Sequence, residues 1–143
     1  MKGRPLDEER YDASRWITEP FHLYDCCMEN DGAAAALLLP AARAKAGPKR
    51  PAYLLGAAAG GDFRSGVHPH NAPDYATANF ETIADDLYAM ARLRPADVGS
   101  VQAYENFTGA VVMALAEHGF FTPAQANDFL TVDSSPHRRA GCR

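Results

Sequence analysis

Two continuous apolar runs constrain the fold of this chain more than any other feature of its sequence. Residues 32–39 and 52–59 are each short and are bounded by turn-forming residues such as Asp31 and Gly60. A short apolar run between turn signals is typical of a strand buried on both faces of a sheet. Segments with helical spacing alternate with these runs, so we expect an α/β fold in which helices cover a buried sheet.

The spacing of apolar residues predicts the helices. Between residues 73 and 92 they recur at steps of three to five positions, which indicates one amphipathic helix. Thr122 and Pro123 are suited to the N-cap and first turn of a last helix. Further elements are expected at residues 6–15 (a short surface helix or arm), 21–27 (extended), 41–46 (helix), 101–104 (strand), 108–118 (helix) and 123–130 (helix).

These elements divide the chain into three parts. Residues 1–20 are expected to form an N-terminal arm, and residues 21–132 the folded domain. Residues 133–143 show no periodicity and are expected to be a disordered tail.

Charge and composition exclude several classes of function. The net charge is −4 and the basic residues form only short patches, so no nucleic-acid surface is expected. The longest apolar stretch, residues 32–42, falls well short of the ~20 residues that span a bilayer. Three cysteines, two of them adjacent, do not form a disulfide framework, and no signal peptide is visible. We therefore expect a cytoplasmic protein.

The sequence contains residue types that bind zinc, but their spacing is not that of a known zinc site. His68 and His70, together with Cys26 and Cys27, are the residue types of a zinc site. Adjacent cysteines are awkward ligands for one tetrahedral metal, and the histidines have none of the usual spacings. We predict no metal site, and we expect both cysteines to be buried structural thiols.

A polar segment between a predicted strand and a predicted helix is the best candidate for a site. It consists of Tyr104, Glu105, Asn106, Phe107 and Thr108. Such junctions hold side chains at a sheet edge beside free helical N–H groups, which is a common place for ligands. The alternative is structural: Tyr104 and Phe107 belong to the core, and Asn106 or Thr108 caps the helix.

Two blocks of this sequence resemble the thiolase superfamily. Asp25-Cys26-Cys27, followed by Asn30-Asp31-Gly32-Ala33-Ala34-Ala35, is similar to a segment of sterol-carrier-type thiolases and thiolase-like lipid-transfer proteins. Tyr104-Glu105-Asn106-Phe107 resembles the loop where thiolases carry Asn-Glu-Ala-Phe and sterol-carrier thiolases carry His-Asp-Cys-Phe. Glu117-His118-Gly119-Phe120 fits the same family. The resemblance covers about Arg4 to Leu130 and places the chain in the C-terminal half of that family.

The resemblance implies a fold and an activity. The fold is a layered α-β-α-β-α arrangement of two similar halves, and the intact family forms dimers. The substrates are coenzyme A thioesters, with no bound cofactor. The expected function is that of a fragment of a thiolase-like acyltransferase or lipid-transfer protein, which forms or cleaves C–C bonds in lipid or sterol metabolism. We expect it to be inactive alone, because the nucleophilic cysteine and the later histidine and cysteine motifs of the family are missing.

Two alternatives stay open. The first is the retro-aldolase branch of the family, which acts on steroid side-chain coenzyme A thioesters with a small partner protein. The second is a non-catalytic subunit that completes a partner chain.

By the same resemblance, Tyr104 and Asn106 are expected to be catalytic, while Glu105, Phe107 and Thr108 contact the substrate. Tyr104 stands where sterol-carrier thiolases have histidine. A tyrosine keeps its proton up to about pH 10, so Tyr104 suits a proton donor better than a base.

Overall fold

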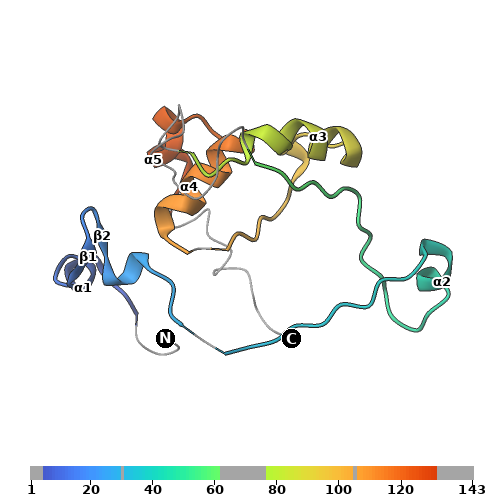
Figure 1. Cartoon of the computed structure of the whole chain (residues 1–143), viewed down its shortest axis with the longest axis horizontal. Coiled ribbons are helices and arrows are strands. Elements are labelled where there is room, and N and C mark those ends of the chain that lie inside the picture. Colours follow the sequence, from blue (N-terminus) through green and yellow to red (C-terminus); the bar gives the residue numbers. More distant parts are fainter. Residues whose placement is uncertain (1–4, 30, 62–76, 105, 132–143) are drawn as a thin grey trace.

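The computed structural model describes residues 5–29, 31–61, 77–104 and 106–131. Helices α3, α4 and α5 gather together, whereas α2 stands apart between two extended segments (Figure 1). In chain order the elements are α1 (Glu8–Asp12), β1 (Trp16–Thr18), β2 (Phe21–His22), η1 (Leu23–Asp25), α2 (Ala41–Lys45), α3 (Glu81–Ala91), η3 (Pro95–Asp97), α4 (Thr108–Glu117), η4 (Pro123–Gln125) and α5 (Ala126–Phe129).

The N-terminal elements form a small unit of their own. Asp7 caps α1, because its carboxylate accepts a hydrogen bond of 2.8 Å from the backbone N–H of Arg10. Strands β1 and β2 then pair antiparallel, with Trp16 opposite His22. The rings of these two residues are in contact, with centroids 3.6 Å apart and their planes tilted by 39°. The short helix expected over residues 6–15 is therefore confirmed, and a two-stranded hairpin follows it.

The predicted buried strands do not form in the part of the chain that the structure describes. Residues 32–39, 52–59 and 101–104 carry no regular structure, and the sheet that is present contains β1 and β2 alone. Leu37 is 83% exposed and Leu54 is 75% exposed. A strand needs a neighbouring backbone to satisfy its N–H and C=O groups, and no described segment runs beside these runs as a ladder partner. The prediction of strands at these three segments is therefore wrong for the described residues, and so is the predicted burial of residues 32–39 and 52–59.

The fold is mixed helix and strand, and the five-layered α-β-α-β-α arrangement is not seen in the described residues. The proposed tail at residues 133–143 lies outside them. The boundaries at residues 20 and 132 stay predictions.

Helix α3 is held at its start by a side chain of α4. The Glu117 carboxylate accepts hydrogen bonds from the backbone N–H groups of Ala78 and Phe80, each 2.7 Å, and from the Thr77 hydroxyl at 2.6 Å. A carboxylate at this end also complements the helix dipole. The helix begins at Glu81, although the spacing predicted a start near residue 73; residues 73–76 lie outside the described part.

The extended segment 52–61 lies against α3 because it carries glycines. A Cβ on Gly60 would come 2.8 Å from Cγ2 of Ile83, and one on Gly56 would come 3.1 Å from the backbone oxygen of Leu87. Only a residue without a side chain allows this approach. Residues 52–59, which were predicted to be a buried strand, thus lie against a helix and not within a sheet.

The C-terminal helices follow the sequence closely. α4 begins at Thr108 and α2 spans the predicted alanine-rich stretch, which confirms both helices. At η4 the Gln125 side chain accepts hydrogen bonds from the N–H and the hydroxyl of Thr122, so the predicted N-terminus is also confirmed. Phe121 is buried and packs against Phe129 with ring centroids 4.8 Å apart.

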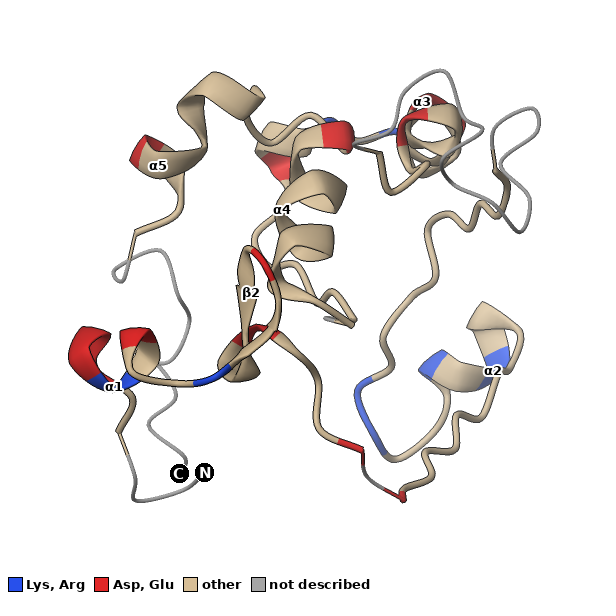
Figure 2. Ribbon diagram, turned by 60° about the vertical axis from the view of Figure 1, so that its left-hand side comes forward, with Lys and Arg blue, Asp and Glu red and all other residues tan. Residues whose placement is uncertain are grey.

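Charged side chains are spread over several elements (Figure 2). Acidic residues lie on α1, α3, α4 and α5, while basic residues on helices occur mainly on α1 and α2. Within the described ranges, no helix is long and apolar enough to cross a bilayer.

Candidate active site

A buried carboxylate organises the region around the proposed site. Asp25 accepts hydrogen bonds from the Tyr11 hydroxyl, the His22 backbone N–H and the Thr108 hydroxyl, each 2.7 Å long. These donors come from α1, from the start of η1 and from the first residue of α4. Asp25 therefore ties the N-terminal unit to α4 and fixes the segment that follows it.

The hydrogen bonds keep Asp25 charged. Burial alone would raise the pKa of this carboxyl, but the bonds from Tyr11, Thr108 and the His22 backbone, with the nearby His22 ring, outweigh burial and hold the pKa below its ordinary value. The same bond to Asp25, followed by burial, raises the pKa of the Tyr11 hydroxyl. Sequence reasoning noted Asp25 only as part of a motif and missed this structural role.

The cysteine pair after Asp25 lies against the polar loop before α4. Cys26 and Phe107 form an isolated antiparallel bridge, and the backbone N–H of Cys27 donates to the Asn106 carbonyl at 3.2 Å. The two blocks that carry the family resemblance are thus brought together in space, although about 80 residues separate them along the chain.

Cys27 is exposed, and Cys26 is half-buried. The prediction that both thiols are buried is therefore wrong, most clearly for Cys27. The reason is the direction of the backbone: the bridge to Phe107 turns alternate residues of an extended segment to opposite sides. The Cys27 thiol lies 3.5 Å from Oδ1 of Asn106 and 4.0 Å from the Tyr104 hydroxyl oxygen.

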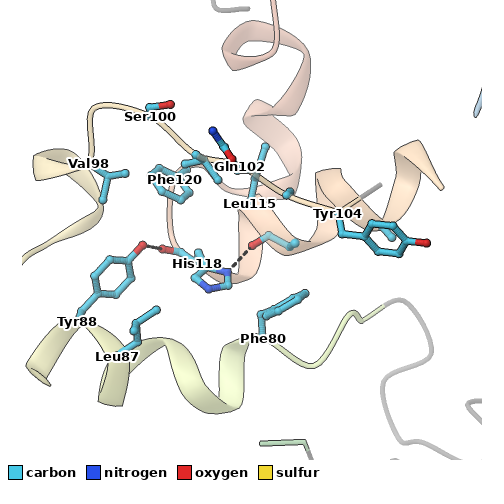
Figure 3. Close-up of a pocket in the computed structure, with 14 residues that line it drawn as sticks. Phe80, Leu87, Tyr88, Val98, Ser100, Gln102, Tyr104, Leu115, His118 and Phe120 are labelled. Atoms are coloured by element: carbon cyan, nitrogen blue, oxygen red, sulfur yellow. Dashed lines mark hydrogen bonds between the residues drawn. The ribbon is translucent and has the colours of Figure 1, made fainter. Parts of the chain in front are cut away.

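A mainly apolar pocket of about 580 Å³ opens beside Tyr104 (Figure 3). It lies between α3, α4 and the segment that leads to Tyr104. Its lining residues are Phe80, Leu87, Tyr88, Val98, Ser100, Val101, Gln102, Ala103, Tyr104, Ala110, Ala114, Leu115, His118 and Phe120. Tyr104 stands at one end with its hydroxyl turned away from His118. The volume suits a small-molecule site, since such pockets typically measure about 300–1,000 Å³.

His118 forms a fixed polar point in the pocket wall. Its Nδ1 lies 2.8 Å from the Ala114 carbonyl, so Nδ1 donates and carries a proton. The Tyr88 hydroxyl donates to the His118 backbone carbonyl at 3.0 Å, and burial raises the pKa of Tyr88. His118 was named from the sequence only as part of a motif, and it was not predicted to line a pocket. The feature that could have indicated this is its position directly after the apolar helix α4.

The structure gives different surroundings to the four predicted site residues that it describes. Tyr104, 82% exposed, and Asn106 lie together beside Cys27. Phe107 packs on Phe21 with ring centroids 5.5 Å apart, and the Thr108 hydroxyl is bound to Asp25. Glu105 lies outside the described residues.

The structural alternative for this loop is largely wrong. Tyr104 is not a core residue. The N-cap of α4 is Phe107, with no side-chain capping bond, so neither Asn106 nor Thr108 caps the helix. Phe107 alone fits that alternative, as a half-buried residue packed on Phe21.

No group of three or more potential metal ligands occurs among the residues that the structure covers. His68 and His70, which were weighed as zinc ligands, lie outside those residues.

The chain is similar to aldolases and lyases that act on steroid side chains. It is 38% identical to a steroid side-chain-cleaving aldolase of Thermomonospora curvata over 133 residues, which is 89% of this chain and 33% of the relative. It is 35% identical to the 17-hydroxy-3-oxo-4-pregnene-20-carboxyl-CoA lyase of Mycobacterium tuberculosis over 130 residues, 90% of this chain and 34% of the relative. The chain therefore spans about a third of the length of these relatives.

A third relative and a solved structure support the thiolase resemblance in part. An acetyl-CoA acetyltransferase of Methanothermobacter thermautotrophicus is 30% identical over 111 residues, 75% of this chain and 27% of the relative. The solved Ltp2-ChsH2(DUF35) aldolase superposes with a TM-score of 0.74 at 32% identity, over 90% of this chain and 34% of that one. No family model matches the chain. The thiolase resemblance is thus supported in part, and the sterol-carrier type is not singled out.

Proposed function

We propose that this chain forms part of a retro-aldolase that cleaves the side chain of a steroid coenzyme A thioester. The single observation that carries the proposal is the position of Tyr104 at the end of an apolar pocket, with Asn106 on the same Cys27 thiol, in a chain 38% identical to a steroid side-chain-cleaving aldolase. An apolar pocket with few polar groups suits a flat, largely hydrocarbon substrate.

The substrate of such a reaction is a thioester with a hydroxyl on the carbon β to its carbonyl. A base, such as a water molecule or a side chain of the complex, takes the proton of the hydroxyl, and the hydroxyl oxygen becomes a ketone oxygen as the bond between the α and β carbons breaks. The electron pair of that bond moves into the thioester, which becomes an enolate, and a proton then adds to the α carbon. The chemistry needs a proton donor or acceptor near the breaking bond and hydrogen-bond donors at the thioester oxygen.

Two residues fit these roles. The Tyr104 hydroxyl, exposed beside the pocket, is suited to donate the proton that the α carbon of the enolate takes up. The Asn106 amide is suited to donate to the thioester oxygen, where negative charge grows. Phe107 and Thr108 hold the loop through Phe21 and Asp25, so we assign them to positioning rather than to substrate contact.

A partner protein is part of the proposal. The structurally similar aldolase is named for two components, and the described part of this chain leaves many large apolar side chains exposed. We therefore expect activity in a complex rather than in the isolated chain.

An acyltransferase is the second candidate, and the relative that favours it is the acetyl-CoA acetyltransferase. That match is weaker in identity and covers less of the chain than the two aldolase-type matches. The retro-aldolase alternative is for this reason preferred over the acyltransferase reading of the sequence.

The test is turnover by the complex with and without the Tyr104 hydroxyl. A steroid β-hydroxyacyl coenzyme A thioester is supplied, and release of the ketone and the shortened thioester is followed by mass spectrometry. Tyr104→Phe is expected to lower kcat by ~10²-fold or more, the usual scale for a positioned proton donor. Tyr53→Phe is the matched control, since Tyr53 is also exposed but does not line the pocket.

Two results would contradict the proposal. One is cleavage of acetoacetyl-coenzyme A without any steroid cleavage, which would support the acyltransferase. The other is unchanged steroid cleavage by the Tyr104→Phe complex, which would remove Tyr104 from the mechanism.

A further inference from the structure

The contacts of the Asn106 side chain point to a role for Cys27. The Cys27 thiol donates to Oδ1 of Asn106 at 3.5 Å, and the backbone N–H of Cys27 donates to the carbonyl of the same residue at 3.2 Å. Asn106 is therefore held at both its backbone and its side chain by one residue from a distant part of the sequence. The same thiol lies 4.0 Å from the Tyr104 hydroxyl.

The thiol decides which end of the Asn106 amide is free. A carboxamide has an oxygen that accepts and an NH₂ group that donates, and a half-turn of the amide exchanges them. With the oxygen engaged by the thiol, the NH₂ group is the end that points away from Cys27. Among the described residues, the Cys27 thiol is the hydrogen-bond partner of the Asn106 side chain.

We propose that Cys27 is a positioning residue, whose thiol holds the Asn106 amide with its NH₂ group towards the thioester oxygen of the substrate. The inference rests on the proposed function and goes beyond it by assigning a residue that neither the sequence motifs nor the comparisons connect with the reaction. Cys27 forms no bond to the substrate. It acts by keeping the donor aligned as negative charge grows on the thioester oxygen, when a correctly aligned donor has its largest effect.

The first experiment compares Cys27→Ala with Cys27→Ser in the active complex. Removing one oxyanion donor outright costs about 10²–10³ in kcat, so loss of its alignment is expected to cost less, about tenfold. KM should stay within about twofold, because the apolar pocket that binds the steroid is untouched. Cys27→Ser keeps a donor at the same position and should restore kcat to within about threefold of the wild type.

A matched control and a double variant separate positioning from general damage. Cys26→Ala changes the neighbouring half-buried thiol, which donates to the His22 carbonyl at 3.6 Å, and keeps the backbone bridge to Phe107, so kcat should be unchanged. In a complex that already carries Asn106→Ala, adding Cys27→Ala should have no further effect on kcat, since a residue that acts through Asn106 has nothing left to align.

A binding measurement gives a readout that needs no turnover. The exposed Cys27 thiol is alkylated with iodoacetamide in the wild-type complex, and the modified peptide is followed by mass spectrometry. A steroid acyl coenzyme A thioester without the β-hydroxyl, which cannot be cleaved, should slow alkylation of Cys27 about fivefold or more. Free coenzyme A should protect less.

The outcomes distinguish the two proposals. If the wild-type complex cleaves the steroid thioester but Cys27→Ala has wild-type kcat, or if its effect adds fully to that of Asn106→Ala, the positioning role is overturned and the proposed function stands. If the wild-type complex neither cleaves nor binds the thioester, the proposed function fails and takes the positioning role with it.

Discussion

Asp25 offers the sharpest test of the structure, because one buried carboxylate joins three separate elements. Asp25→Ala removes the acceptor of the Tyr11 hydroxyl, the His22 backbone N–H and the Thr108 hydroxyl. The perturbation leaves the wild-type donors in place. We therefore expect the α1–β1–β2 unit to separate from α4 more easily.

The magnitude follows from what each donor can do next. His22 is buried, so its N–H loses its partner without replacement, at a cost of about 1–3 kcal/mol. The two hydroxyls belong to residues that are not buried, and they can turn to water, so each loses only about 0.5–1.5 kcal/mol. Together these losses should lower the unfolding free energy by about 3 kcal/mol. This lies near the low end of the summed ranges, because losses at neighbouring groups are not fully additive. Asp25→Asn keeps one acceptor oxygen and should cost about 1 kcal/mol.

The variants should also differ in their response to acid. The folded-state pKa of Asp25 lies below its unfolded value. Its contribution is therefore complete above the ordinary carboxyl pKa of about 4 and is lost as the pH falls through the lower folded value. Wild-type protein should lose this stability below about pH 4, whereas Asp25→Asn, which cannot titrate there, should lack that part of the acid dependence.

Urea unfolding followed by Trp16 fluorescence is a suitable assay, because Trp16 is the one tryptophan of the chain and contacts the His22 ring beside this network. Asp31→Ala, which removes an exposed carboxylate, serves as the control and should stay within about 0.5 kcal/mol of the wild type. The reasoning is refuted if Asp25→Ala behaves like that control, or if Asp25→Asn keeps the full acid dependence of the wild type.

Two further substitutions test the packing around the pocket. Glu117→Ala should lower the unfolding free energy by about 2 kcal/mol, because it removes the acceptor of backbone N–H groups at the start of α3. Amide hydrogen exchange at Phe80 should become faster. Unchanged exchange would contradict the capping role of Glu117. Gly109→Ala should cost about 1–3 kcal/mol by overpacking, since its Cβ would come 2.9 Å from the Phe21 ring. Gly99→Ala, which meets nothing within 4 Å, is its control in a thermal melt; equal melting temperatures for the two variants would show that the Phe21 ring moves aside freely.

Local sequence was sufficient for the helices of this chain. The alanine-rich stretch after Pro40 and the stretch from Thr108 form helices, and Thr122 with Gln125 opens the last one, because capping bonds and helical apolar spacing act within a few residues. The two blocks that carry the resemblance, around Asp25 and around Tyr104, are brought into contact by the structure.

The tertiary structure decided what those blocks do. Nothing local shows that Asp25 is held by donors from two other elements, that Cys27 is exposed against Asn106, or that the Thr108 hydroxyl donates to Asp25. Each of these depends on contacts between residues far apart in sequence, which apolar periodicity does not encode. The apolar runs at residues 32–39 and 52–59 show the same limit. Their composition predicted buried strands, but a strand requires the backbone of a neighbouring strand, and that is a property of the assembled fold.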